Sequence, residues 1–193
     1  LIIQSNLAEA DLWASFPLQM QKQIVDNDIR VFYLDAFQIA REEAGFCYSR
    51  YDNPTNAGLE ELVTALEGGH GALACASGMA ASHLALLAAG AGKDSLILCS
   101  SDVYGSVYTM VENIFPALGT RSILMDMTDL NKVEDVIRCE KPSIVYFEVV
   151  TNPLTKVVDA PAAIELAHRY GAAVIIDNTF TTPYLFKPFT AGA

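Results

Sequence analysis

The chain has 193 residues, of which 52% are hydrophobic, and a formal net charge of −11 at pH 7. This proportion of apolar residues indicates a globular protein with a sizeable core rather than a disordered segment. The negative charge disfavours nucleic acid and anionic membrane surfaces as partners, although it leaves room for a local cationic pocket. Apolar runs are short and broken by charge or glycine, so no segment predicts a membrane span.

Cysteine and histidine spacing gives no sign of a metal site. The four cysteines are far apart and form no CxxC pair: Cys47, Cys75, Cys99 and Cys139. The three histidines follow no metal-ligand spacing either. The first residues lack the basic region of a signal peptide and the initiator methionine. We therefore expect a cytoplasmic protein with no bound metal, whose two ends are cut from something longer.

Residues 1–44 and 45–193 show different patterns, and we expect a domain boundary between them. The first segment predicts a helix over 12–25, a strand over 30–34 and a helix over 36–44. From residue 45 onward helix and strand patterns alternate. Helices are predicted over 56–67, 79–89, 106–118, 129–139 and 161–170, and strands over 71–76, 95–99, 121–125, 143–147 and 172–176. The alternation predicts an α/β fold with a mostly parallel sheet that is flanked by helices on both faces.

Polar residues cluster where these strands are predicted to end. Ser77-Gly78, Asp102 to Tyr104, Glu148 to Asn152 and Asp177 each follow a different strand. Open α/β sheets bind ligands at the carboxyl ends of their strands, so these side chains are candidates for one shared site. The alternative for any one of them is an ordinary turn or helix cap, which Asp, Asn, Ser and Gly commonly form.

Several short motifs follow one another in a meaningful order. They are Tyr48-Ser49-Arg50, Asn53-Pro54-Thr55, Ser77-Gly78-Met79, Tyr104-Gly105, Glu148 with Asn152-Pro153, and Asp177-Asn178-Thr179-Phe180. Together they resemble the pyridoxal-phosphate-dependent enzymes of cysteine and methionine metabolism, which include cystathionine synthases and lyases and methionine γ-lyase. The resemblance implies that residues 45–193 form an incomplete large domain of the fold-type I, aspartate aminotransferase-like architecture. It also implies pyridoxal 5′-phosphate as cofactor, a small amino-acid substrate and a homo-oligomeric parent protein.

The resemblance implies a role for each matching residue. The N–H groups of Gly78 and Met79, at the start of a helix, would bind the cofactor phosphate, as helix N-termini bind anions. Asp177 would keep the pyridine nitrogen protonated, so that the ring can accept electrons. Tyr104 would stack on the ring and is a candidate for proton exchange with the substrate. Asn152 would donate a hydrogen bond to the phenolic oxygen.

Two further residues match a pair that acts across a subunit interface in this family. Tyr48 and Arg50 would reach the phosphate bound by the neighbouring subunit, a task that suits a planar, permanently charged guanidinium. Without the resemblance, an exposed arginine beside an aromatic residue is the simpler interpretation. The chain also departs from the family at Val150, where a proline usually lies two residues before the asparagine.

The lysine that binds the cofactor in this family lies in a Ser-x-Thr-Lys segment, shortly after the Gly-Ala that corresponds to Gly192-Ala193. None of the lysines of this chain has that context: Lys22, Lys93, Lys132, Lys141, Lys156 and Lys187. We therefore expect a fragment of an enzyme that catalyses β- or γ-elimination or replacement on sulfur amino acids. By itself this chain should show no covalent cofactor linkage and no steady turnover.

Two alternatives stay open. Through motifs at 24–40, residues 1–44 weakly resemble the γ-type domain of 2-oxoacid:ferredoxin oxidoreductases. The chain would then be a chimera, with a junction between unrelated proteins at 41–48. No cluster-ligating cysteine pattern or thiamine site supports that function. The other alternative is a non-catalytic chimeric or truncated protein. Retained affinity for a phosphate anion would separate the enzyme fragment from the non-catalytic protein.

Overall fold

The computed structural model describes Ser49 and residues 53–193. Elements predicted for residues 12–44, and Tyr48 and Arg50, lie outside the described residues. The chain divides into two units, Leu1–Leu59 and Glu60–Ala193. The helix α4 (Pro54–Glu67) crosses this division. It begins after Asn53, whose Oδ1 accepts the N–H of Thr55 (3.1 Å) and of Asn56 (3.0 Å). It ends at Glu67, where the predicted helix also ends, and Gly68 then adopts a left-handed φ of 71°.

The second unit is built on an all-parallel sheet. Its strands are β1 (Leu96–Ser100), β2 (Arg121–Met125), β3 (Ile144–Glu148) and β4 (Ala173–Asp177), in the order β2-β1-β3-β4. Each pairs with its neighbours in parallel. The predicted parallel α/β fold is therefore confirmed in this part of the chain. Because the strands run in one direction, their carboxyl ends meet at one edge of the sheet.

The strand predicted over residues 71–76 is wrong. This segment carries no strand, and Leu73 within it is 73% exposed. A strand is stable only when its N–H and C=O groups pair with a neighbouring strand. Here the N–H of Ala74 instead donates to the side-chain Oε1 of Glu60, at 2.6 Å. Local apolar composition suggested a strand, but it does not supply a partner strand.

The predicted helices of the second unit are present with small shifts at their ends. The helices are α5 (Gly78–Ala88), α6 (Gly105–Thr109), α7 (Phe115–Ala117), α8 (Leu130–Glu140) and α9 (Ala160–Arg169). A π-helical turn, η1 (Met110–Ile114), separates α6 from α7 within the segment that was predicted as one helix. Two short elements, α10 (Thr182–Leu185) and the 3₁₀ helix η2 (Pro188–Ala191), were not predicted. Each of the two has a proline in its first turn.

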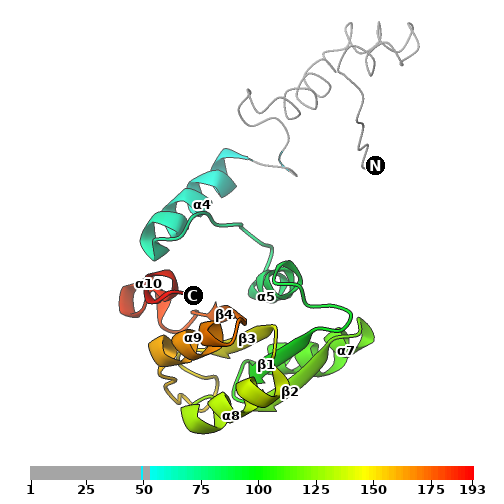
Figure 1. The fold of residues 1–193 in the computed structure, drawn as a ribbon. Coiled ribbons are helices and arrows are strands. Elements are labelled where there is room, and N and C mark those ends of the chain that lie inside the picture. Colours follow the sequence, from blue (N-terminus) through cyan, green and yellow to red (C-terminus); the bar gives the residue numbers. More distant parts are fainter. Residues whose placement is uncertain (1–48, 50–52) are drawn as a thin grey trace, which may run out of the picture. The chain divides into compact units, whose positions relative to one another are not determined.

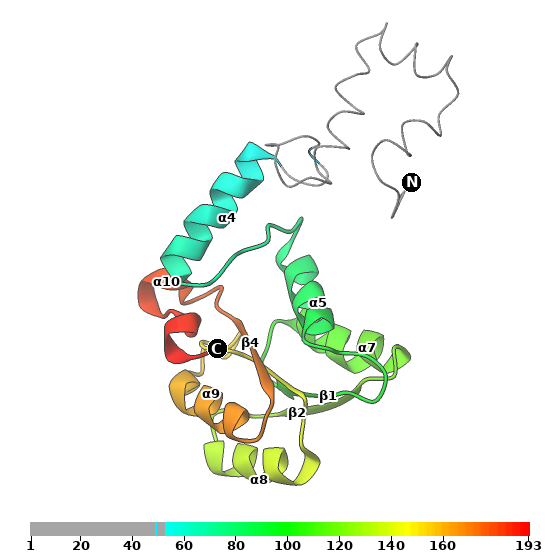
Figure 2. The ribbon, with the colours of Figure 1, turned by 45° about the horizontal axis from the view of Figure 1, so that its top comes forward.

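Apolar side chains alternate between the two faces of the sheet. Leu98, Val145 and Phe147 belong to a core that includes Val133 and Ile137 of α8. Their neighbours along β1 and β3 belong to a second core on the opposite face, with α5, α6, η1 and α7. Figures 1 and 2 show α8 and α9 on one side of the sheet and α5 and α7 on the other. The sheet is therefore a buried middle layer that holds the strand ends in place.

Replacing Ile137 with alanine should destabilise the second unit. Ile137 is fully buried between α8 and the sheet, so Ile137→Ala should lower the free energy of unfolding by about 2–5 kcal/mol. Ile114→Ala is the matched control, because Ile114 is 49% exposed and its truncation should lower the same quantity by at most about 1 kcal/mol. Urea denaturation followed by circular dichroism measures both. Equal losses in the two variants would contradict this layer assignment.

Candidate functional site

A cleft with a volume of about 410 Å³ lies at the carboxyl ends of the strands. Its walls come from the start of α5, the segments after β1 and β3, and the end of β4. The lining residues include all the described residues to which a cofactor role was given by resemblance: Gly78, Met79, Tyr104, Asn152 and Asp177. Segments far apart in sequence are thus brought to one place by the parallel sheet. The roles of these residues stay predictions, and Tyr48 and Arg50 lie outside the described residues.

The start of α5 leaves backbone N–H groups open toward the cleft. Ser77 caps the helix, because its Oγ accepts the N–H of Ala80 at 3.1 Å. Within the described part of the chain, no acceptor is bonded to the N–H groups of Gly78 and Met79. A Cβ placed on Gly78 would meet no atom within 4 Å, so the space beside this backbone is empty. The helix end can therefore accept an anion at close approach.

Asp177 is the last residue of β4 and is held by the turn that follows it. Its Oδ1 accepts the backbone N–H of Thr179 at 3.0 Å and also the Thr179 hydroxyl. Both bonds use the same oxygen, so Oδ2 is not used by them. On the neighbouring strand, Glu148 is in register with Asp177. Side chains in register on adjacent parallel strands point to the same face, so two carboxylates lie side by side at this edge.

Glu148 connects two walls of the cleft. Its side chain is buried, with the residue only 5% exposed. Oε1 accepts the backbone N–H of Tyr104 at 2.7 Å, and Oε2 accepts that of Asn152 at 2.9 Å. Burial raises the pKa of Glu148, the nearby charge of Asp177 raises it further, and the two N–H bonds oppose the rise. The sequence marked Glu148 as a strand-end residue but did not predict these two contacts.

Two residues near the ends of β1 and β3, Cys99 and Tyr146, are buried in the core. The Tyr146 hydroxyl lies 3.1 Å from Ser82 Oγ on α5, and burial raises the pKa of Tyr146. Burial, with a contribution from Glu148, raises the pKa of Cys99 to about 12. Cys99 is therefore a protonated core thiol and is not available as a nucleophile at neutral pH.

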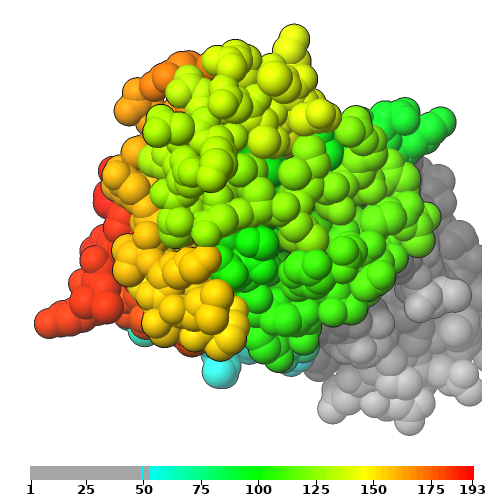
Figure 3. All heavy atoms as spheres, turned by 90° about the horizontal axis from the view of Figure 1, so that it is seen from below, coloured from blue at the N-terminus to red at the C-terminus, as the bar shows by residue number. Residues whose placement is uncertain are grey.

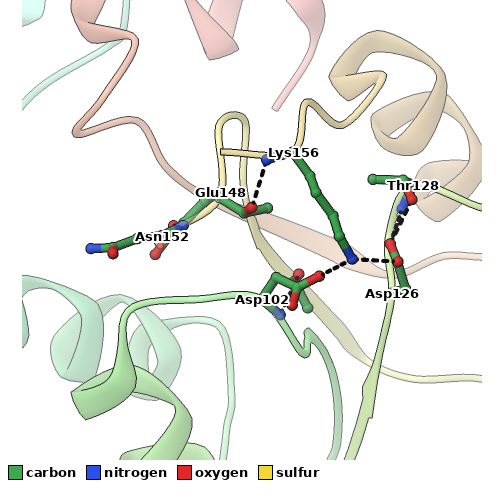
Figure 4. Close-up of polar contacts among 8 residues, drawn as sticks. Asp102, Asp126, Thr128, Glu148, Asn152 and Lys156 are labelled. Carbon is green, nitrogen blue, oxygen red and sulfur yellow. Dashed lines mark hydrogen bonds and ion pairs between the residues drawn. The ribbon is translucent and has the colours of Figure 1, made fainter. Parts of the chain in front are cut away.

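Lys156 joins three strand ends outside the cleft. Its Nζ lies 2.7 Å from Asp102 Oδ2, after β1, and 2.8 Å from Asp126 Oδ2, after β2. Figure 4 shows the lysine side chain reaching between the two carboxylates from the loop after β3. In Figure 3 this loop (gold) lies directly beside the segment after β1 (green). The lysine was assigned no role from sequence, because only the fold brings Asp102 and Asp126 within its reach.

Within the described residues, no cluster of histidine, cysteine, aspartate and glutamate side chains is suited to a metal ion. In the same part of the chain, no helix has the length and apolar character that a membrane span needs.

A family profile described as Cys/Met metabolism PLP-dependent enzyme matches residues 23–193. A cystathionine gamma-lyase of Bacillus subtilis is 40% identical over 154 residues, which are 80% of this chain and 40% of that protein. A crystal structure of a putative O-acetylhomoserine (thiol)-lyase from Campylobacter jejuni, which carries a pyridoxyl-lysine monophosphate, has a TM-score of 0.73 and 31% identity. The match covers 82% of this chain and 38% of the lyase chain. A crystal structure of cystathionine gamma synthase from Xanthomonas oryzae, in complex with cystathionine, has a TM-score of 0.73 and 32% identity. The match covers 78% of this chain and 38% of the synthase chain.

The extent of these matches concerns two features of the chain, its length relative to its relatives and the predicted junction. The chain spans about 40% of the length of the curated relatives it matches. The family match begins at residue 23, which lies upstream of the junction predicted at 41–48. The domain boundary at residue 44 stays a prediction.

Removing the Lys156 ammonium group should raise the pKa of Asp126. The hydrogen bond from Lys156 is the largest cause that holds this pKa below its usual range, and bonds from Thr128 add to it. In Lys156→Met the pKa should rise toward the ordinary value of about 3.9, without reaching it because the Thr128 bonds remain. An NMR titration of the Asp126 carboxyl carbon measures this pKa.

The stability that this ionised aspartate contributes is present above the unfolded pKa and is lost as pH falls through the lowered folded pKa. In Lys156→Met the free energy of unfolding should therefore fall less steeply as the pH drops from the unfolded pKa to the lowered folded pKa of Asp126. Lys93→Met is the control, since no ion pair of Lys93 occurs in the described structure. An unchanged Asp126 titration in Lys156→Met would show that the ion pair does not form in solution.

Proposed function

Since the chain belongs to the Cys/Met metabolism PLP-dependent enzyme family, we propose that its cleft holds the ring and phosphate of pyridoxal 5′-phosphate. The observation that carries this proposal is the convergence of Gly78, Met79, Tyr104, Asn152 and Asp177 on one cleft. These residues were singled out from sequence by their match to the motifs of the family, and they come from separate loops, the start of α5 and the end of β4.

The chemistry of the donor set fits this cofactor. The open N–H groups at α5 suit a phosphate, and the empty space beside Gly78 allows it to approach the backbone. Asp177, oriented through Oδ1, would hold a proton on the pyridine nitrogen. Asn152 would donate its side-chain amide to the phenolic oxygen, and Tyr104 would cover one face of the ring. When bound, the cofactor supplies an electron-accepting ring for chemistry next to the amino group of the substrate.

We extend the proposal to the reaction class. Relatives named as a cystathionine lyase and a cystathionine synthase favour a sulfur amino acid as substrate, with C–S bond cleavage or formation as the reaction. The parent protein would be a cytoplasmic homo-oligomer in which Tyr48 and Arg50 serve a neighbouring subunit. Among the described residues no lysine lines the cleft, so this chain should bind the cofactor without a covalent bond.

Pyridoxine 5′-phosphate is the appropriate probe for the proposal, because it has the ring and phosphate but no aldehyde to react with surface lysines. The wild-type chain should bind it in a fluorescence titration and should release it when inorganic phosphate is added. Failure to bind either ligand would overturn the proposal and favour a non-catalytic protein.

Asp177→Asn should weaken binding of this probe by about tenfold, since an uncharged amide stabilises the protonated ring nitrogen less well. Asparagine keeps an oxygen that can accept the Thr179 bonds, so the loop should survive. The absorption spectrum of the bound probe should change to that of an unprotonated ring. Asp135→Asn is the control, because Asp135 is exposed on α8 and pairs only with Arg138 among the described residues. An identical spectrum and affinity in Asp177→Asn would remove this residue from the site.

Gly78→Val should separate ligand binding from folding. The added side chain meets no protein atom where its Cβ begins, so thermal stability should change little. It would fill the space proposed for the phosphate, and affinity for inorganic phosphate should fall by at least about tenfold. Isothermal titration calorimetry measures this loss, and Gly58→Val, at an equally open glycine on α4, is the control. Undiminished phosphate affinity would place the anion elsewhere.

A further inference from the structure

The cleft has two walls whose separation must be set by something other than local sequence. Tyr104 follows β1 and Asn152 follows β3, and the two residues come from different loops. The proposed function requires both at once, one on the face of the ring and one at its phenolic oxygen. Because the ring is rigid, the Tyr104 and Asn152 contacts can form together only if the two loops have a fixed spacing. If either loop moved, one of the two contacts would be lost.

The side chain of Glu148 is bonded directly to both Tyr104 and Asn152. Each oxygen of Glu148 accepts one backbone N–H, that of Tyr104 at 2.7 Å and that of Asn152 at 2.9 Å. The bond from Tyr104 is at the short end of the N–H···O range, and the bond from Asn152 has the usual length. The bonds are made to the backbone of the two residues, so they set the position of each residue and leave its side chain free to face the cleft.

Glu148 is itself held firmly. It is the last residue of β3, which lies between β1 and β4 in the sheet, and all five residues of this strand are buried. Its side chain is on the same face as that of Tyr146, which is 1% exposed in the core below the cleft. Through its two hydrogen bonds, Glu148 therefore fixes both loops relative to the sheet.

The Lys156 ion pairs connect the same loops but cannot replace this link. They join Lys156 to Asp102 and Asp126, with the lysine side chain 37% exposed, and they do not touch Tyr104 or Asn152. Salt weakens exposed ion pairs much more than it weakens hydrogen bonds to a buried carboxylate. The contacts that determine the Tyr104 to Asn152 spacing are therefore those of Glu148.

We propose that Glu148 is a positioning residue of the cofactor site, whose carboxylate sets the spacing between the residue that stacks on the ring and the residue that binds its phenolic oxygen. The inference rests on the proposed function. It assigns Glu148 an effect on recognition of the ring and none on recognition of the phosphate, which binds at α5.

Glu148→Gln is the test, because glutamine keeps the shape but replaces one acceptor oxygen with an NH₂ donor, which leaves one of the two N–H groups without a partner. Affinity for pyridoxine 5′-phosphate should fall by about tenfold, and affinity for inorganic phosphate should change by less than about twofold. Exchange of the Tyr104 and Asn152 amide hydrogens, followed by NMR without ligand, should accelerate. Glu165→Gln, at an exposed residue of α9, should change none of these quantities.

The outcomes are distinguishable. If the wild-type chain binds the probe and Glu148→Gln binds it equally well, this inference is overturned while the proposed function stands. Equal losses of probe and phosphate affinity would mean a general collapse of the cleft and would also overturn it. A wild-type chain that binds neither ligand overturns the proposed function and the inference together. If the glutamine variant does not fold, Glu148→Asp serves the same test, because its shorter carboxylate keeps the charge but should not reach both N–H groups.

Discussion

Parallel pairing of β1 to β4 is the constraint on which the rest of this structure depends. Parallel strands need a crossover between each pair, and the crossovers here place α8 and α9 on one face and α6, η1 and α7 on the other. Every strand consequently delivers its last residue to the same edge. Asp102, Asp126, Glu148 and Asp177 meet there for this reason, although they are dispersed along the sequence. The cleft exists because the direction of the strands, rather than local sequence, gathers polar residues.

Carboxylates that lie close together at one edge of the sheet repel one another, and the structure offsets this repulsion in two ways. Outside the cleft, Lys156 lies between Asp102 and Asp126 and balances them. Inside it, Glu148 accepts two backbone N–H groups, which stabilise its charged form against the cost of burial. Asp177 is oriented by Thr179 and has no bonded cation in the described structure, which suits a group that is proposed to stabilise a protonated ring. The N-terminus of α5 then offers positive partial charge for a phosphate in a strongly acidic chain.

The comparison of predicted and observed elements shows where sequence patterns are reliable. The strands at 121–125 and 143–147 and the helix at 129–139 were located within about one residue, since short apolar runs, helical periodicity and capping residues are local signals. The segment 71–76 was predicted as a strand and is not one, because a strand needs a partner that local sequence cannot provide. The π-turn within 106–118 was missed for a related reason. It is one residue wider than an α-helical turn, and the pattern of apolar residues barely changes.

The alternation of elements, the parallel α/β class and the order of the motifs that identify the family could all be inferred from the amino-acid sequence. It was sufficient because side-chain periodicity, helix caps and short motifs are written in consecutive residues. Which strand ends meet is known only from the fold. The same holds for the contacts of Glu148 with Tyr104 and Asn152 and for the position of Lys156 between Asp102 and Asp126. Those contacts depend on the strand order β2-β1-β3-β4, which arises from how whole layers pack and is not encoded in any one segment.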